Sequence, residues 1–477
     1  MAGEAYKAIV VGSGPNGLAA AITLQRAGHS VLVLEGMDTI GGGTRTQALT
    51  LPGFHHDVCS AVHPMGAISP FFNTLPLDRH GLEWLYPEVS AAHPFDDGTA
   101  AALYPSLAQT ARGLGVDEKA YHRFMEPVIK ALPQLLPGLL SAFPGFSHPF
   151  LLADFARRAL PPALRTARRF ATEPTRGLWA GMAAHAMLPL EKSMTSAIGM
   201  MLMAASHLGG WPVARGGSIS IGNALAAYFL SIGGTIQTGF FVKSLADLPP
   251  AKAILFDVTP RQLLEIAGAS LPAGYRKRLA AYRYGMGVFK IDWAVEGPVP
   301  FRAPVCRKAV TVHLGGGIRE IARSESAAWS GQVPESPFVL LTQPGVVDSS
   351  RAPAGKQVVW GYCHVPHSSG HDMTEAIERQ VERFAPGFRD SILAKSVMSA
   401  VDMQAYNPNY VGGDINGGVQ DIFQHFARPV LSFSPYRTPA KGIYFCSSST
   451  PPGGGVHGMC GFHAAERVLK DGILDRV

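Results

Sequence analysis

The sequence predicts an α/β protein with two interlocked domains. Three observations predict this class: the length and composition, a strand-turn-helix-strand pattern at the N-terminus, and strand-like runs that alternate with helical runs farther along. The chain has 477 residues, of which 47% are hydrophobic and 16% are charged. A chain of this length buries a large core and exceeds one simple domain.

Composition excludes several classes of protein. The formal net charge is +6, but the basic residues are spread along the chain without a dense Lys/Arg block, which argues against nucleic-acid binding. The cysteines form no CxxC pair, and their odd number predicts reduced thiols rather than a disulfide framework. They are Cys59, Cys306, Cys363, Cys446 and Cys460.

The start of the chain predicts a cytoplasmic protein. An apolar, strand-like run follows the first residues at once and leaves no room for the apolar region and cleavage site of a signal peptide. Two uncharged stretches, 131–153 and 193–214, are long enough to span a bilayer. We expect neither to do so, because prolines should break the first repeatedly and glycines with a proline interrupt the second. The breakers are Pro133, Pro137, Pro144 and Pro149, then Gly209, Gly210 and Pro212.

Between these stretches, residues 155–170 read "FARRALPPALRTARRF", with arginines alternating with apolar residues around a Pro-Pro break. Two interpretations remain open. The segment is either the solvated face of packed helices or a surface that contacts a membrane peripherally.

The strongest motif is "YKAIVVGSGPNGLAAAITLQRAGHSVLVLEG" at residues 6–36. An apolar strand at 8–11 leads into Gly12-x-Gly14-x-x-Gly17, then a helical pattern, a second strand at 31–34 and Glu35. Gly12 permits the tight turn, Gly14 lets a pyrophosphate approach the backbone, and Gly17 lets helix and strand pack closely. The helix N-terminus favours phosphate, and Glu35 is placed to accept hydroxyls of an adenosine ribose. The pattern predicts dinucleotide binding.

The next motif favours FAD over NAD. Residues 37–46, "MDTIGGGTRT", place a glycine run and Arg45 directly after the acid. This run resembles the second glycine motif of glutathione-reductase-type FAD domains, which lies beside the adenosine and pyrophosphate. An arginine there also complements phosphate charge.

Both ends and the middle of the chain resemble the phytoene desaturase-related flavoproteins. The segments that carry the resemblance are the N-terminal motif with "LPGFHHDVCSAVHP", the central "ARGGSISIGNALAAYFLSIGGTIQTGFFVKSL", and "GIYFCSSSTPPGGGVHGMCGFHAA" near the C-terminus. That family includes carotenoid desaturases, carotenoid isomerases and retinol saturases, and it shares its fold with flavin amine oxidases. The resemblance places Val242 where the backbone meets the adenine.

The glycine-rich stretch 450–469 also gains a function from this resemblance. A last strand, "GIYFCSSS", would deliver the chain to the flavin, where glycines let the backbone lie against the ribityl chain and the ring. The helix that follows, from about Val456 or Gly458, would direct its positive N-terminus at the edge of the ring that gains charge on reduction.

Two residues are candidates for the catalytic site. The resemblance places His457 at the flavin face, where amine oxidases carry an aromatic side chain; its role as acid or base stands beside that of a neutral shaping residue. Lys290 lies on an alternating strand and resembles the lysine that amine oxidases hold through water to flavin N5. A solvated edge-strand lysine is the alternative.

The motifs and the resemblance together predict the following FAD contacts: Gly12, Ser13, Gly14, Pro15, Asn16, Gly17, Glu35, Gly36, Gly42, Gly43, Thr44, Arg45, Ser60, Val242, Pro452, Gly455, Val456, His457, Gly458 and Met459. In "GFHHDVCSAVHP", Asp57 and Ser60 should lie nearest the flavin ring. His55, His56 and His63 lack a second ligand cluster with a usual spacing, so no metal site is predicted. The Asn and Asp residues of "NPNYVGGDINGG", 407–418, suit turns, and their spacing alone indicates no substrate contact.

The predicted architecture is therefore a glutathione-reductase-type FAD-binding Rossmann domain with a mixed-sheet and helical substrate domain. The FAD domain should be discontinuous, formed by 1–75, 210–285 and 405–477, and 76–209 with 286–404 should form the substrate domain. The segment 76–209 is rich in Leu, Ala, Pro and Met, which predicts an apolar helical cap.

The sequence thus predicts an FAD-dependent oxidoreductase that desaturates an extended hydrophobic substrate such as an isoprenoid, polyene or fatty-chain compound. Oxygen or a quinone would reoxidise the flavin, and a homodimer is compatible with the sequence. Four alternatives remain: double-bond isomerase, saturase, flavin amine oxidase, and a prenyl-binding or lipid-binding escort without catalysis. The paired glycine motifs argue against the escort.

Overall fold

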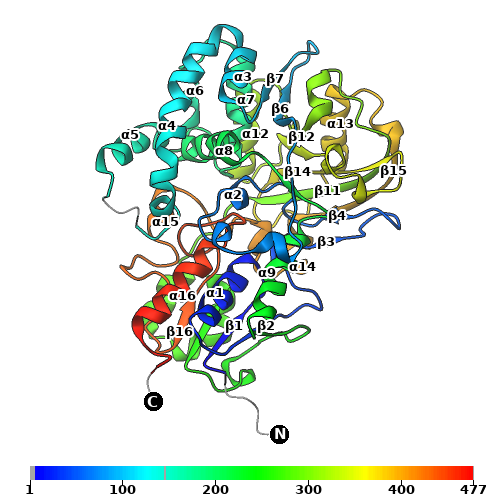
Figure 1. The fold of residues 1–477 in the computed structure, drawn as a ribbon. Helices are drawn as coiled ribbons and strands as arrows, with labels where there is room; N and C mark the ends of the chain where they lie inside the picture. Colours follow the sequence, from blue (N-terminus) through cyan, green and yellow to red (C-terminus); the bar gives the residue numbers. More distant parts are fainter. Residues whose placement is uncertain (1–5, 144–146, 476–477) are drawn as a thin grey trace.

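The computed structural model describes residues 6–143 and 147–475. The predicted N-terminal strand is the central strand of a five-stranded parallel sheet (Figure 1). In spatial order the strands are β16 (Ile443–Phe445), β10 (Ala253–Phe256), β1 (Ala8–Val11), β2 (Val31–Leu34) and β9 (Thr235–Gln237). These strands come from three separate parts of the chain.

Helices cover both faces of this sheet, which explains why β1 is apolar at every position. Successive side chains of a strand point to opposite faces. Ala8 and Val10 pack with α1 (Pro15–Arg26), α9 (Ile219–Ser231) and α16 (Met459–Asp471). Ile9 and Val11 pack with α10 (Pro260–Ala267) and α11 (Ala273–Ala280). A parallel strand buried on both faces has this composition.

The second sheet has seven strands and is mixed, because β12 pairs with β6 in parallel while the other pairs are antiparallel. The predicted α/β class with a mixed-sheet second domain is confirmed. In spatial order the strands are β15 (Ile392–Met398), β11 (Gly287–Glu296), β14 (Lys356–Val365), β13 (Val339–Thr342), β12 (Ala309–Leu314), β6 (Val89–Pro94) and β7 (Ala100–Leu103).

A helical layer lies above the first sheet and beside the second (Figure 1). Its helices are α3 (Leu107–Gly113), α4 (Glu118–Leu139), α5 (Pro149–Ala159), α6 (Ala163–Ala167), α7 (Glu173–Ala184) and α8 (Thr195–Gly209). The other α-helices and strands of the described residues are α2 (Pro64–Ala67), α12 (Ile318–Trp329), α13 (Thr374–Phe384), α14 (Ala400–Tyr406), α15 (Ile422–Phe426) and the short strand pairs β3 (Thr46–Gln47) with β4 (His56–Asp57) and β5 (Trp84–Leu85) with β8 (Val213–Ala214).

Helix α4 corrects one expectation. Prolines were expected to break the segment 131–153 repeatedly, but α4 continues through Pro127, Pro133 and Pro137. Each proline removes one backbone hydrogen bond, and burial of the helix's apolar face offsets that loss. Pro149 instead occupies the first turn of α5, where no hydrogen bond is lost. Pro144 lies outside the described residues.

None of the helices described in 6–143 and 147–475 combines the length and the apolar composition needed to cross a bilayer. This finding agrees with the expectation for 131–153 and 193–214. In the second stretch, α8 ends at Gly209, and Gly210 follows with φ of 77°.

Candidate functional site

The glycine loop after β1 is shaped for close contact with a ligand. Gly12 has φ of 106°, which favours glycine, and a Cβ atom on Gly17 would collide with the carbonyl oxygen of Gly12. The Gly17 amide donates a hydrogen bond of 2.9 Å to Asp257, which follows β10. The N-terminus of α1 thus faces the carboxyl ends of the central strands, where nucleotides bind in such sheets.

Glu35 lies at the end of β2 and is held by four donors. One carboxylate oxygen accepts hydrogen bonds from the Ser13 amide at 3.0 Å and the Ser13 hydroxyl at 2.6 Å. The other accepts from Arg45 Nη2 and from the Met37 amide, both at 3.0 Å. Arg45 is 3% exposed and also donates to the Thr39 carbonyl, so its guanidinium fixes Glu35 against the glycine loop.

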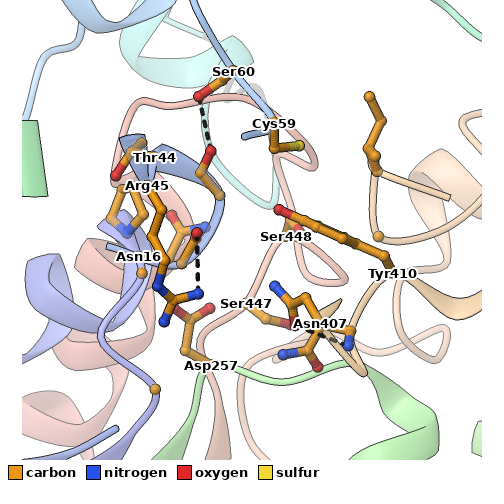
Figure 2. A pocket seen from close by; sticks show the side chains of 18 of the residues that line it. Asn16, Thr44, Arg45, Cys59, Ser60, Asp257, Asn407, Tyr410, Ser447 and Ser448 are labelled. Atoms are coloured by element: carbon orange, nitrogen blue, oxygen red, sulfur yellow. Dashed lines mark hydrogen bonds between the residues drawn. The ribbon is translucent and has the colours of Figure 1, made fainter. Parts of the chain in front are cut away.

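The second glycine motif forms the opposite side of this loop. Residues Gly42–Thr44 make one turn of 3₁₀ helix, and a Cβ atom on Gly42 would lie 2.9 Å from the Cα of Gly14. Ser60 donates to the Gly43 carbonyl at 3.1 Å and holds the next segment over the turn (Figure 2). Larger side chains at these positions would fill the space between the two motifs.

A cavity of about 540 Å³ begins at these motifs and extends into the second domain. Figure 2 shows Asn16, Thr44, Arg45 and Ser60 on one side of it and Asn407 and Tyr410 on the other. The predicted contacts that line it are Gly12, Ser13, Gly14, Pro15, Asn16, Glu35, Gly36, Gly42, Gly43, Thr44, Arg45, Ser60, Val242, Gly455 and Val456. Gly17, Pro452, His457, Gly458, Met459 and Lys290 are not among the lining residues.

The C-terminal glycine turn reaches the cavity, but the helix after it begins behind the wall. Gly455 has φ of 130° and lines the cavity with Val456. Helix α16 starts at Met459, one residue after the later of the two predicted starts, and Gly458 is its N-cap residue. A Cβ atom on Gly461 would collide with the Asn16 carbonyl oxygen, so α16 and α1 pack backbone to backbone.

His457 is buried, with 1% of its surface exposed. Its Nδ1 accepts the Met459 amide hydrogen at 3.1 Å, and its own carbonyl accepts a 2.7 Å hydrogen bond from Ser69. Burial lowers the pKa of His457 to about 4, so the ring is neutral near pH 7. This geometry corresponds to the shaping role; a catalytic role stays a prediction.

Lys290 lies on β11, which is an interior strand between β15 and β14, so the edge-strand alternative is wrong. The ammonium group pairs with Asp292, and its Nζ lies 5.7 Å from the centre of the Trp360 ring, which lines the cavity. Burial lowers the pKa of Lys290 and raises that of Asp292 to about 6. His56 Nδ1 lies 3.5 Å from Asp292. Lys290 is therefore behind the wall rather than on it.

Asp57 was expected to lie nearest the flavin ring, but it does not line the cavity. Its carboxylate accepts hydrogen bonds of 2.8 Å from Arg351, 2.7 Å from the Thr46 hydroxyl and 2.8 Å from the Ser218 amide. It joins three segments and is unavailable to a ligand. Its neighbour Cys59 lines the cavity with Ser60. Among the residues described, no three His, Cys, Asp or Glu side chains are grouped as metal ligands would be.

Sequence reasoning missed several lining residues. Asp257 follows an apolar strand, and this position was the signal that could have identified it. Residues 407–410 were interpreted only as turns, yet they line the cavity. Trp360 and Tyr362 lie on β14 and His185 follows α7, far away in the sequence, so no local pattern brings the histidine to the two aromatic rings.

A glycine loop at a helix N-terminus, an acid at the end of the next strand and a cavity that enters a second domain define an oxidoreductase with a dinucleotide-type redox cofactor. Comparisons with known proteins agree. Residues 10–75 match the family model of the NAD(P)-binding Rossmann-like domain.

The chain is similar over almost its whole length to several oxidoreductases. Pyridine nucleotide-disulfide oxidoreductase domain-containing protein 2 of Mus musculus is 27% identical over 564 residues, which cover 98% of this chain and 94% of that protein. The 4,4'-diapolycopene oxygenase of a Methylomonas species is 23% identical, covering 94% of this chain and 95% of that one. The structure of putrescine oxidase bound to putrescine matches with a TM-score of 0.62 at 16% identity, over 99% of this chain and all of that one.

The resemblance inferred from the motifs is therefore confirmed. The protein is an oxidoreductase that resembles the phytoene desaturase-related proteins in sequence, and it has the fold of putrescine oxidase. Its cofactor is of the flavin or nicotinamide type.

Proposed function

We propose that this protein binds FAD and dehydrogenates an extended apolar substrate. The observation that carries the proposal is the cavity, which runs from the two glycine motifs and Glu35 to a wall formed by Leu202, Leu340 and Trp360. One end has the polar backbone groups that a dinucleotide needs, and the other has apolar side chains.

The residues present fit FAD. Gly14 and Gly42 leave a space that a Cβ atom on either would narrow. A Cβ atom on Gly14 would lie 2.8 Å from the Asp257 carboxylate, and one on Gly42 would lie 2.9 Å from the Cα of Gly14. Asn16 Oδ1 lines the cavity and is buried, and it has no hydrogen-bond partner among the residues described, which is costly unless a ligand supplies one. Two glycine motifs, rather than one, favour FAD over NAD.

The chemistry would divide between the cofactor and the chain. Bound FAD would accept a hydride from a substrate C–H bond, and the adjacent carbon would lose a proton to a base or to water as the double bond forms. The chain would exclude bulk solvent and align the substrate through Leu202, Leu340 and Trp360. His457 would shape the turn at Gly455 as a neutral group, because its Nδ1 is already engaged. Oxygen or a quinone is the proposed final acceptor.

Amine oxidation is less well supported, although putrescine oxidase shares the fold. An ammonium substrate needs a carboxylate or a pair of facing aromatic rings. The acids on the cavity wall, Glu35, Asp257 and Glu265, all belong to the first sheet and its helices. Trp360 and Tyr362 meet edge to face at 69° and do not form a parallel cage. Double-bond isomerisation and saturation remain alternatives that use the same cavity.

The test is anaerobic mixing of the flavin-loaded protein with phytoene, retinol or putrescine, followed by flavin absorbance and product chromatography. We expect phytoene or retinol to bleach the flavin and putrescine to leave it oxidised. Bleaching by putrescine alone would contradict the proposal. A rearranged double bond without bleaching would replace dehydrogenation with isomerisation.

We further propose that the substrate is taken up from an anionic membrane surface. Phe150 and Phe433 are 89% and 98% exposed, and the Phe143 ring lies 6.4 Å from that of Phe433. Exposed arginines follow along 155–170: Arg157, Arg165, Arg168 and Arg169. Exposed aromatic and basic side chains together are typical of peripheral membrane contact.

A further inference from the structure

The substrate end of the cavity closes on a histidine. His185 directly follows α7 and lines the cavity with Leu202 of α8, Leu340 of β13, and Trp360 and Tyr362 of β14. Most of these side chains are apolar. A polar atom that faces such a wall therefore has a large effect on which ligands bind.

His185 is hydrogen-bonded to a second buried histidine. The two Nε2 atoms, of His185 and His313, are 3.0 Å apart, and the rings meet at 71°. Burial lowers the pKa of His185 to about 3 and that of His313 well below its usual range. Both rings are neutral near pH 7, so one Nε2 carries the shared proton and the other accepts it.

The surroundings of His313 decide which ring donates. Its Nδ1 is buried and has no hydrogen-bond partner in the described part of the chain, and a Cβ atom on Gly181 of α7 would lie 2.7 Å from this nitrogen. A proton on Nδ1 would be a buried N–H without an acceptor, which is rarer in proteins than an unpaired acceptor. His313 therefore carries its proton on Nε2 and donates it to His185.

Two neighbouring buried histidines follow the same rule. His93 Nε2 donates to the Gly316 carbonyl at 2.6 Å, and its unpartnered Nδ1 is the unprotonated nitrogen. His364 Nδ1 donates to Glu325 at 2.7 Å, and its unpartnered Nε2 is again the unprotonated one. In each ring the lone pair, rather than the proton, is left without a partner.

His185 must then carry its own proton on Nδ1. Within 6–143 and 147–475 no group hydrogen-bonds to this atom, and His185 is only half-buried, whereas His313 is fully buried. Since His185 is a lining residue, this N–H is a hydrogen-bond donor open to the cavity.

We propose that His185 donates this hydrogen bond to an oxygen of the substrate. The substrate class is then an extended apolar molecule with a carbonyl, ether or ester oxygen at the end held in the helical layer. This inference rests on the proposed function and narrows it. A pure hydrocarbon would cover the N–H without accepting from it, and that desolvated donor would weaken binding.

The test measures binding rather than turnover. Geranylacetone, an isoprenoid ketone that only accepts hydrogen bonds, and farnesene, an isoprenoid hydrocarbon, are titrated into the protein while tryptophan fluorescence is recorded, since Trp360 lines the cavity. His185→Phe should weaken geranylacetone binding about tenfold and leave farnesene unchanged, because one hydrogen bond is lost. His185→Asn places an amide near the position of Nδ1 and should restore ketone binding.

His93→Phe is the matched control, because His93 is a buried histidine that does not line the cavity. It should leave the ratio of the two affinities unchanged, and thermal melting should show that every variant is folded. A wild-type protein that binds farnesene as tightly as geranylacetone would overturn the inference and leave the proposed function standing. Equal ketone binding by the His185→Phe and His185→Asn variants would also overturn it. Binding of neither probe would overturn both.

Discussion

At the scale of single residues, Asp257 is the most informative group beside the glycine loop, because it accepts the Gly17 amide hydrogen. Burial raises its pKa from 3.8 to about 7, and its neighbour Glu35 adds to the effect. A raised carboxyl pKa means that ionisation costs more in the folded state. Its contribution to the free energy of unfolding is therefore greatest below about pH 4, falls as the pH rises to about 7, and stays low above.

Asp257→Asn should remove this fall in the free energy of unfolding with rising pH. The amide oxygen still accepts from the Gly17 amide, so we expect the variant to gain stability over wild type at about pH 8, by up to about 4 kcal/mol, and to gain none at about pH 4. Urea unfolding of both proteins at the two pH values measures this. If the two proteins differed in free energy of unfolding by the same amount at both pH values, Asp257 would not titrate in this range.

His457 has two interpretations that one variant separates. Its Nδ1 accepts the Met459 amide hydrogen, and its pKa of about 4 keeps it neutral. His457→Asn can still accept near that position, so we expect flavin content and the rate of flavin reduction to change by less than about threefold. A loss of a hundredfold or more would identify His457 as a proton-transfer group.

Residue-scale prediction from sequence succeeded where chemistry is local. Gly12, Gly14, Glu35 and Arg45 belong to two consecutive motifs within residues 6–46, and all of them line the cavity. Lys290 was singled out because it lies on an alternating strand and resembles the amine-oxidase lysine, and the structure buries it on an interior strand. Its partner Asp292 is two positions away, on the same face of β11, but only the packed sheet places both behind Trp360.

At the scale of elements, the contact between α1 and α16 joins the two glycine-rich ends of the chain. Gly461 lies so close to the Asn16 carbonyl that no Cβ atom fits. Gly461→Ala should therefore separate the helices and lower the free energy of unfolding by about 2 to 3 kcal/mol. Flavin content should fall with it, because Asn16 and Val456 line the cavity from these two segments.

Gly113→Ala is the control for this change, since a Cβ atom there would meet nothing within 4 Å and Gly113 ends helix α3. Urea midpoints and flavin absorbance of both variants provide the comparison. An unchanged midpoint for Gly461→Ala would contradict the close backbone packing of α16 against α1.

Element prediction from sequence was accurate for strands with flanking glycine motifs and weaker for the helical layer. The expected strands at 8–11 and 31–34 match β1 and β2. The prolines of α4 were misjudged, because their local cost is visible in the sequence and the burial that offsets it is not. Tertiary packing therefore determines that α4 stays helical through its prolines.

At the scale of the whole molecule, the exposed aromatic side chains lead to a prediction about membranes. Phe150→Ser with Phe433→Ser should reduce co-sedimentation with vesicles that contain anionic lipid several-fold, because two exposed rings are lost. Phe423→Ser is the control for non-specific co-sedimentation caused by loss of any exposed aromatic ring, since Phe423 is 80% exposed on α15. Equal sedimentation of wild type and the double variant would contradict membrane contact and favour the solvated-face interpretation of 155–170.

The proposed activity depends most directly on the cofactor. The decisive measurement is the visible absorbance spectrum of the purified protein, with anaerobic dithionite titration and mass spectrometry of the molecule that heat releases. We predict flavin bands that dithionite bleaches and a released mass equal to that of FAD. A colourless protein that takes up no added FAD would contradict the account.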